Sequence, residues 1–90
     1  MSNYAIGPAR EAVIKGLEDL AAFLRDNPGV PVWQYGTDVV YCPRGEDKRA
    51  EVDRIAALVG RAPEQRPAQY KVTRKFGPVA YVAVTQAEST

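Results

Sequence analysis

The sequence contains no histidine and a single cysteine, Cys42. One thiol cannot close a disulfide within the chain, so no disulfide framework holds it together. A structural zinc site normally needs four Cys or His ligands, and we therefore expect neither a metal nor another cofactor. Without histidine, a serine or cysteine activated by that base is excluded as a nucleophile. No other nucleophile lies beside a base in the sequence pattern, so we expect a protein that is not an enzyme.

Long hydrophobic runs are also missing. No stretch approaches the roughly 18 apolar residues that would span a bilayer. The opening "MSNYAIGPAREAV" lacks the charged region and apolar run of a signal peptide. We expect no contact with membranes and place the protein in the cytoplasm, where an unpaired thiol is usual.

What is present is typical of a small folded domain. The 90 residues are 46% hydrophobic and 26% charged, with a net charge of +1. This length predicts one domain over residues 1–90, with frayed ends at 1–7 and 86–90. The charge is uneven, because residues 61–90 carry five basic and two acidic side chains.

Two segments have the apolar spacing of amphipathic helices. In the first, Val13, Leu17, Leu20 and Leu24 follow Gly7-Pro8, and "DNPG" ends the pattern at 26–29. This predicts a helix over 8–26. In the second, Val52, Ile55, Ala56 and Val59 precede Gly60, a residue suited to a helix C-terminus. This predicts a helix over 46–59, with Glu46 and Asp47 in its first turn.

Two further segments have strand patterns, and between the second helix and the last of them "RAPEQRPA", residues 61–68, predicts a loop by its two prolines and polar content. "VPVWQYGTDVVYC" is rich in aromatic and β-branched residues around a glycine, which predicts a hairpin of 31–35 and 38–42. "QYKVTRKFGPVAYVAVT", residues 69–85, predicts a second hairpin. A three-residue connection, 76–78, would pair Val72 with Val82 and gather the apolar residues on one side. A two-residue turn would instead mix the valines with Lys71 and Lys75. We favour the first, since register normally buries the apolar set together.

The expected order is therefore α-β-β-α-β-β. Neither α-β-β half could bury a helix stripe and a hairpin alone, so the fold class we predict is α+β. We expect one four-stranded antiparallel sheet with two helices packed on one side.

The side of the sheet away from the helices is the candidate contact surface. If the rings of the first hairpin point outward, the surface combines aromatic and basic side chains. We predict that it binds a partner through Trp33, Tyr35, Tyr41, Lys71, Lys75 and Tyr81.

Three interpretations of these rings remain open. They can be core, with the facing inverted, because large aromatic residues are usually mostly buried. They can form a protein contact, most simply a symmetric dimer, since Tyr and Trp are enriched at interface centres. They can stack on bases of a single-stranded nucleic acid, although a net charge of +1 is low for that role. The nucleic-acid set would be Arg61, Arg66, Lys71, Arg74 and Lys75.

Three segments carry a resemblance to known proteins: "LEDLAAFLRDNPGVPV", "VDRIAALVG" and "VTRKFGPVAYVAV". In style they are similar to small uncharacterised proteins of high-GC actinobacteria and of their phages or mobile elements. The resemblance implies an accessory protein that binds and blocks, or recruits, a host protein. It implies no catalytic residues.

The hypothesis is therefore a small non-enzymatic module that binds a host protein or a second copy of itself through the open sheet surface. The alternative is single-stranded nucleic-acid binding through the same surface and the basic segment 61–75.

Overall fold

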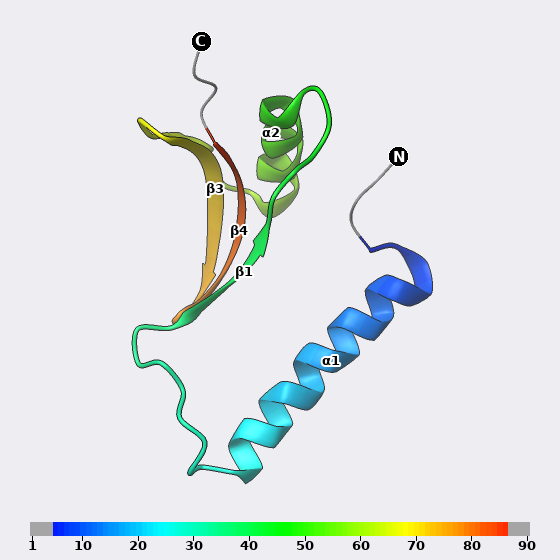
Figure 1. Ribbon diagram of the computed structural model, residues 1–90, viewed down its shortest axis with the longest axis vertical. Helices are drawn as coiled ribbons and strands as arrows, with labels where there is room; N and C mark the ends of the chain where they lie inside the picture. Colours follow the sequence, from blue (N-terminus) through cyan, green and yellow to red (C-terminus); the bar gives the residue numbers. More distant parts are fainter. Residues whose placement is uncertain (1–4, 87–90) are drawn as a thin grey trace. The chain divides into compact units, whose positions relative to one another are not determined.

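The computed structural model describes residues 5–86 (Figure 1). The chain divides into two compact units, Met1–Val32 and Trp33–Thr90, and each is described by itself. The elements follow the order α1, β1, α2, β2, β3, β4. Much of the two ends expected to fray, residues 1–4 and 87–90, lies outside the described part of the chain, and the single domain over 1–90 stays a prediction. Between residues 5 and 86, neither helix has the length and apolar content needed to cross a membrane.

The first unit contains one helix, α1, which spans Gly7–Asp26 and confirms the helix expected at 8–26. A proline occupies its first turn, where a missing N–H costs nothing. At the other end, the Asn27 side-chain amide donates to the Phe23 carbonyl at 2.8 Å. A single helix offers no second layer to pack on, and within this unit no residue of α1 is buried.

The second unit is built on a four-stranded sheet. Its strands are β1 (Thr37–Tyr41), β2 (Glu64–Gln65), β3 (Gln69–Phe76) and β4 (Val79–Gln86), in the order β1-β4-β3-β2. β4 is antiparallel to β3 and parallel to β1. The α+β class is confirmed, but the expectation of an antiparallel sheet is wrong, because one pair is parallel.

The expected first hairpin is also absent. Residues 31–35 form no strand, and β1 pairs with β4 rather than with the segment before it. The segment 61–68, expected to be a loop, contributes the short strand β2 instead. A parallel pair needs a long crossover connection. The chain between β1 and β4, which contains α2, supplies it.

The β3–β4 turn has two residues, Gly77 and Pro78, and not the three that we expected. Phe76 pairs with Val79, and Val72 pairs with Ala83 rather than with Val82. Gly77 has a φ of 63°, the positive value that tight two-residue hairpin turns require at their first central position. Because side chains alternate along a strand, this one-residue difference moves every β4 side chain to the other face relative to β3.

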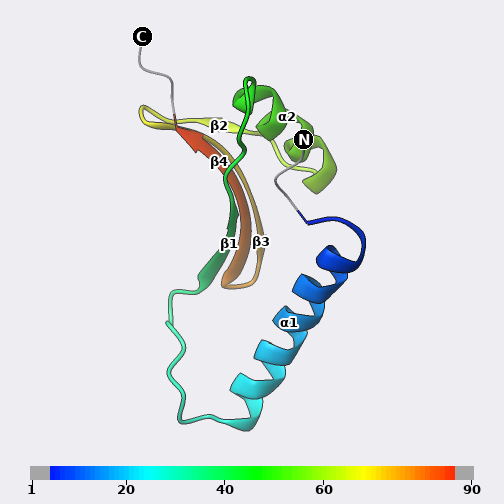
Figure 2. The same ribbon diagram turned by 45° about the vertical axis from the view of Figure 1, so that its right-hand side comes forward.

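Helix α2 (Lys48–Val59) covers one face of this sheet, as two views of the unit show (Figures 1 and 2). The helix begins two residues later than expected, because Asp47 is its N-cap and accepts from the Ala50 N–H at 3.0 Å. Such a cap stabilises a helix by about 1 kcal/mol. The core consists of α2 residues packed on β3 and β4: Val52, Ile55, Ala56, Tyr70, Val72 and Ala83. That α1 joins α2 on one side stays a prediction.

The start of β1 is held close to the β3–β4 turn. The Thr37 N–H donates to the Pro78 carbonyl at 3.2 Å. Next to it, Gly36 has a φ of 94°, and a Cβ built on it would lie 1.7 Å from the Pro78 carbonyl oxygen. Only glycine fits this approach without moving the backbone.

We expect Gly36→Ala to lower the free energy of unfolding by at least about 2 kcal/mol, because it adds both a clash and an unfavourable φ. Chemical denaturation followed by circular dichroism measures the change. Gly29→Ala is the matched control, since Gly29 has no atom within 4 Å of its would-be Cβ and no positive φ. Equal stability of the two variants would contradict the close approach of β1 to the turn.

Candidate functional site

The faces of the sheet follow from the register. Residues paired across strands point to the same side, and neighbours along a strand point to opposite sides. Tyr70, Val72 and Ala83 face α2, so Lys71, Thr73 and Lys75 point away from it with the residues that they pair with. We call this second side the open face, because no described element of the Trp33–Thr90 unit covers it.

Three rows of side chains cross the open face. The first row runs Asp38, Ala80, Lys75, and the second runs Val40, Val82, Thr73. A third row joins Val84 to Lys71 and Glu64. The central strand β4 therefore contributes an apolar column of Ala80, Val82 and Val84.

The column is only partly sheltered by its neighbours. Ala80 and Val82 are buried, whereas Val84 is half-buried. On the edge strand β1, Val40 is 53% exposed. Apolar side chains thus reach solvent between charged residues on the two flanking strands, β1 and β3.

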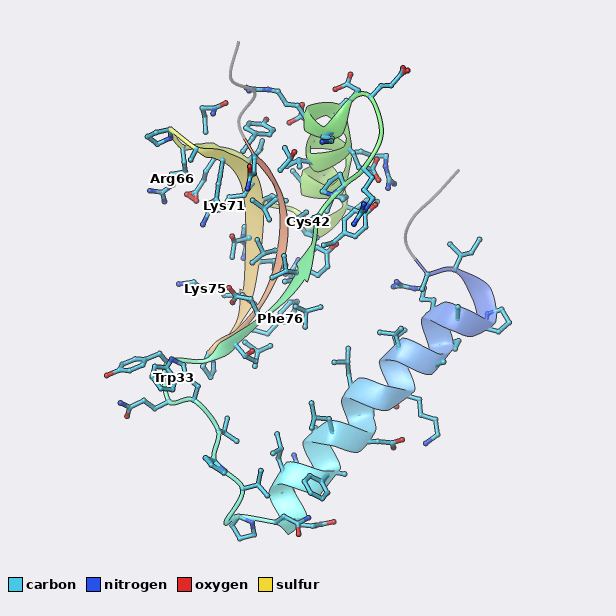
Figure 3. All side chains as sticks on the ribbon, in the orientation of Figure 1. Trp33, Cys42, Arg66, Lys71, Lys75 and Phe76 are labelled. Carbon is cyan, nitrogen blue, oxygen red and sulfur yellow. The ribbon has the colours of Figure 1, made fainter. Side chains whose placement is uncertain are left out.

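The charges of the open face lie on opposite sides of the column. Lys71 and Lys75 project from β3 on the side away from α2 (Figure 3). Asp38 lies on β1, in the same row as Lys75. Over residues 5–86, none of these three side chains forms an ion pair, whereas Glu64 is bound to Arg66 at 3.0 Å. These unpaired charges are available to a partner.

Trp33 and Tyr35 lie outside the rows, in the segment that leads into β1. They are 70% and 75% exposed. Their rings meet edge to face, with centroids 5.5 Å apart. Figure 3 shows Trp33 at the end of the sheet where the β3–β4 turn lies. The structure therefore leaves these two rings reachable, next to the Lys75 end of the open face.

The other two aromatic residues of the expected contact surface are not on it. Tyr41 and Tyr81 are half-buried and pack against the core under α2. The expectation that they share a surface with Lys71 and Lys75 is wrong. The cause is the two-residue turn, which places Val82 rather than Tyr81 on the lysine side, and the parallel pairing of Tyr41 with Ala83.

The basic residues of the nucleic-acid alternative are divided between several parts of the unit. Arg74 points toward α2, where its guanidinium donates to the Val59 carbonyl at 2.8 Å. Arg61 donates to the Gly60 carbonyl at the end of α2. Arg66 forms an ion pair with Glu64. Of the five basic residues, Lys71 and Lys75 therefore remain on the open face, and neither has an ion-pair partner among the described residues.

A shallow hollow of about 290 Å³ lies on the other side of the sheet, beside the N-terminus of α2. Its lining mixes acidic and basic side chains. Arg49 donates to the Gln65 side chain at 2.6 Å and stacks 4.0 Å from the Tyr70 ring centroid, so its charge is already engaged. Within residues 5–86, no group of three or more Cys, Asp or Glu side chains is placed to hold a metal ion.

The open-face residues missed in the sequence include Asp38, Val40, Glu64, Ala80, Val82 and Val84. The signal for them was present in β4, whose residues 79–84 are all apolar. A strand that is apolar on both faces is typical of the centre of a sheet with both sides covered. Within the described part of this unit, α2 covers one face of β4, and the apolar side chains on the other face have no covering layer.

Comparison of the chain with protein-family models, with curated proteins and with solved structures finds no match. The case for a function therefore depends on the surface itself.

One polar contact of the covered face shifts the pKa of a tyrosine. The Tyr70 hydroxyl donates to the Asp53 carboxylate, and this hydrogen bond, aided by desolvation and by the negative charge, raises the pKa of Tyr70 above its ordinary value. The Arg49 guanidinium opposes the shift. The folded state thus holds the phenol proton more tightly than the unfolded state does.

We expect this contribution to stability to be complete at neutral pH and to disappear as the pH rises beyond about 10, through the folded-state pKa. Urea denaturation from pH 7 to 11 should show the difference between wild type and Tyr70→Phe shrinking at the alkaline end. Tyr35→Phe, on an exposed ring, is the control and should follow the wild type throughout. A difference that is constant with pH would contradict the Tyr70–Asp53 contact.

Proposed function

We propose that this chain is a small protein-interaction module, whose contact surface is the open face together with the exposed pair Trp33 and Tyr35. The apolar column of β4 is the main support for the proposal. This central strand is apolar on both faces of the sheet, but within the described part of the Trp33–Thr90 unit α2 covers only one face. Val40 and Val84 bring apolar surface to solvent beside it. Exposed apolar patches rimmed by polar residues mark interaction sites.

The aromatic pair supports the same function. Trp and Tyr are the residues that most often dominate the energy of protein interfaces. Two such rings, each at least 70% exposed, lie in one short segment beside the sheet. The accessory role that the resemblance implies, with a host protein as target, is one form of this proposal. Catalysis plays no part in it.

Nucleic-acid binding has less support in the geometry. A stacking platform needs rings and cations on one surface. Tyr41, Tyr81, Arg61 and Arg74 are directed elsewhere, which leaves Lys71 and Lys75, on one flank, as the cations that the open face can offer. We therefore advance protein binding as the function.

The test is photo-crosslinking in cells of the source organism, with p-benzoylphenylalanine placed singly at Tyr35 or Val40. If the surface is a contact, irradiation should yield discrete covalent protein adducts at both positions. The matched control is the same residue at Leu58, which lies on α2 and is 73% exposed.

Adducts at Tyr35 and Val40 but not at Leu58 would support the proposal. An absence of adducts at the first two positions, or equal yields at all three, would contradict it. The adduct mass also identifies the class of partner: twice the chain mass indicates a second copy, and any other mass indicates a foreign protein.

A further inference from the structure

We propose that the partner of the open face is a second copy of this chain. The two sheets stack face to face about a two-fold axis that lies between them, above β4 and parallel to it. This inference rests on the proposed function and names the occupant of the same surface. Its support is the arrangement of charges within the rows, which makes the face complementary to itself.

The geometry follows from the pairing of the strands. A two-fold axis parallel to the strands and above β4 exchanges the two flanking strands, so β1 of one copy lies over β3 of the other. The position along the strands does not change in this rotation. Each row therefore faces the same row of the second copy, in reverse order across the sheet.

The first row then brings opposite charges together. Asp38 and Lys75 share a row with Ala80 between them. In the stacked pair, Asp38 of each copy faces Lys75 of the other, which gives two equivalent ion pairs. Neither residue has an ion-pair partner within the described part of one chain.

The centre of the contact is apolar. Ala80, Val82 and Val84 of one copy lie over the same residues of the other, as an interface with two-fold symmetry requires of residues near its axis. In the second row, Val40 faces Thr73. Stacked sheets pack about 10 Å apart with their strands within about 30° of parallel, which these small and medium side chains can fill.

A foreign acidic protein is the competing occupant, since Lys71 and Lys75 would attract it. The self-complementary interpretation is favoured because Asp38 would repel such a partner, whereas it completes the contact with a second copy. Like charges placed opposite each other across an interface cost more than a missing contact.

The experiment uses sedimentation velocity and equilibrium on the full chain, with Asp38→Lys, Lys75→Asp and the double variant. Each single variant places like charges opposite each other twice, and we expect its self-association to weaken by at least about tenfold. The double variant restores opposite charges and should recover most of the wild-type affinity. An equimolar mixture of the two single variants should associate more tightly than either alone, since every facing pair is then attractive.

Glu18→Lys is the matched control. It makes the same change in net charge as Asp38→Lys, at an exposed position of α1 that has no ion-pair partner among residues 5–86. It should leave self-association unchanged. Circular dichroism of all variants checks that they fold.

A wild-type chain that stays monomeric at millimolar concentration would overturn the inference, and a foreign-mass adduct at Val40 would then leave the proposed function standing. A dimer whose affinity is unchanged in the charge-reversal variants would also overturn it, because the contact would then use another surface such as the outer edge of β1. Failure of the double variant and of the mixture to recover affinity would exclude the two-fold axis along β4.

Discussion

The two-residue turn at Gly77 and Pro78 sets the facing of the whole sheet. It joins β3 to β4 so that Phe76 pairs with Val79, and every later pair follows from that one. Glycine supplies the positive φ, and the Pro78 carbonyl also accepts from Thr37, so the same turn holds the start of β1. A turn one residue longer would exchange the two sides of β4. The core under α2 and the open face are therefore fixed by the same local constraint.

As a consequence, the two faces of the sheet carry different kinds of side chain. The side under α2 holds the large residues, including the rings of Tyr41, Tyr70 and Tyr81, and the Tyr70–Asp53 hydrogen bond. The open face keeps small and β-branched side chains in the centre and charges on its flanks. A surface of that composition suits a flat protein partner more than bases, which need rings to stack on.

Both helices and the second hairpin could be predicted from the sequence, because their apolar spacing and their glycine and proline signals are local. The first hairpin could not, since β1 pairs with a strand about 40 residues later and no local pattern encodes a parallel partner. The expected register failed because we weighed burial of one apolar set above the turn chemistry of Gly77. Of the expected site, Lys71, Lys75, Trp33 and Tyr35 are reachable, whereas Tyr41 and Tyr81 are half-buried on the other face, packed against the core.

The assignment of residues to the two faces of the sheet depends on the register of β3 against β4. Nuclear Overhauser contacts between backbone Hα protons measure this register directly. In a hairpin closed by a two-residue turn, alternate pairs bring their Hα protons close together. The account predicts a strong contact between Thr73 and Val82, and similar ones for Lys71 with Val84 and Lys75 with Ala80. Contacts of Val72 with Val82, in place of Thr73, would contradict it and would return Tyr81 to the side of the lysines.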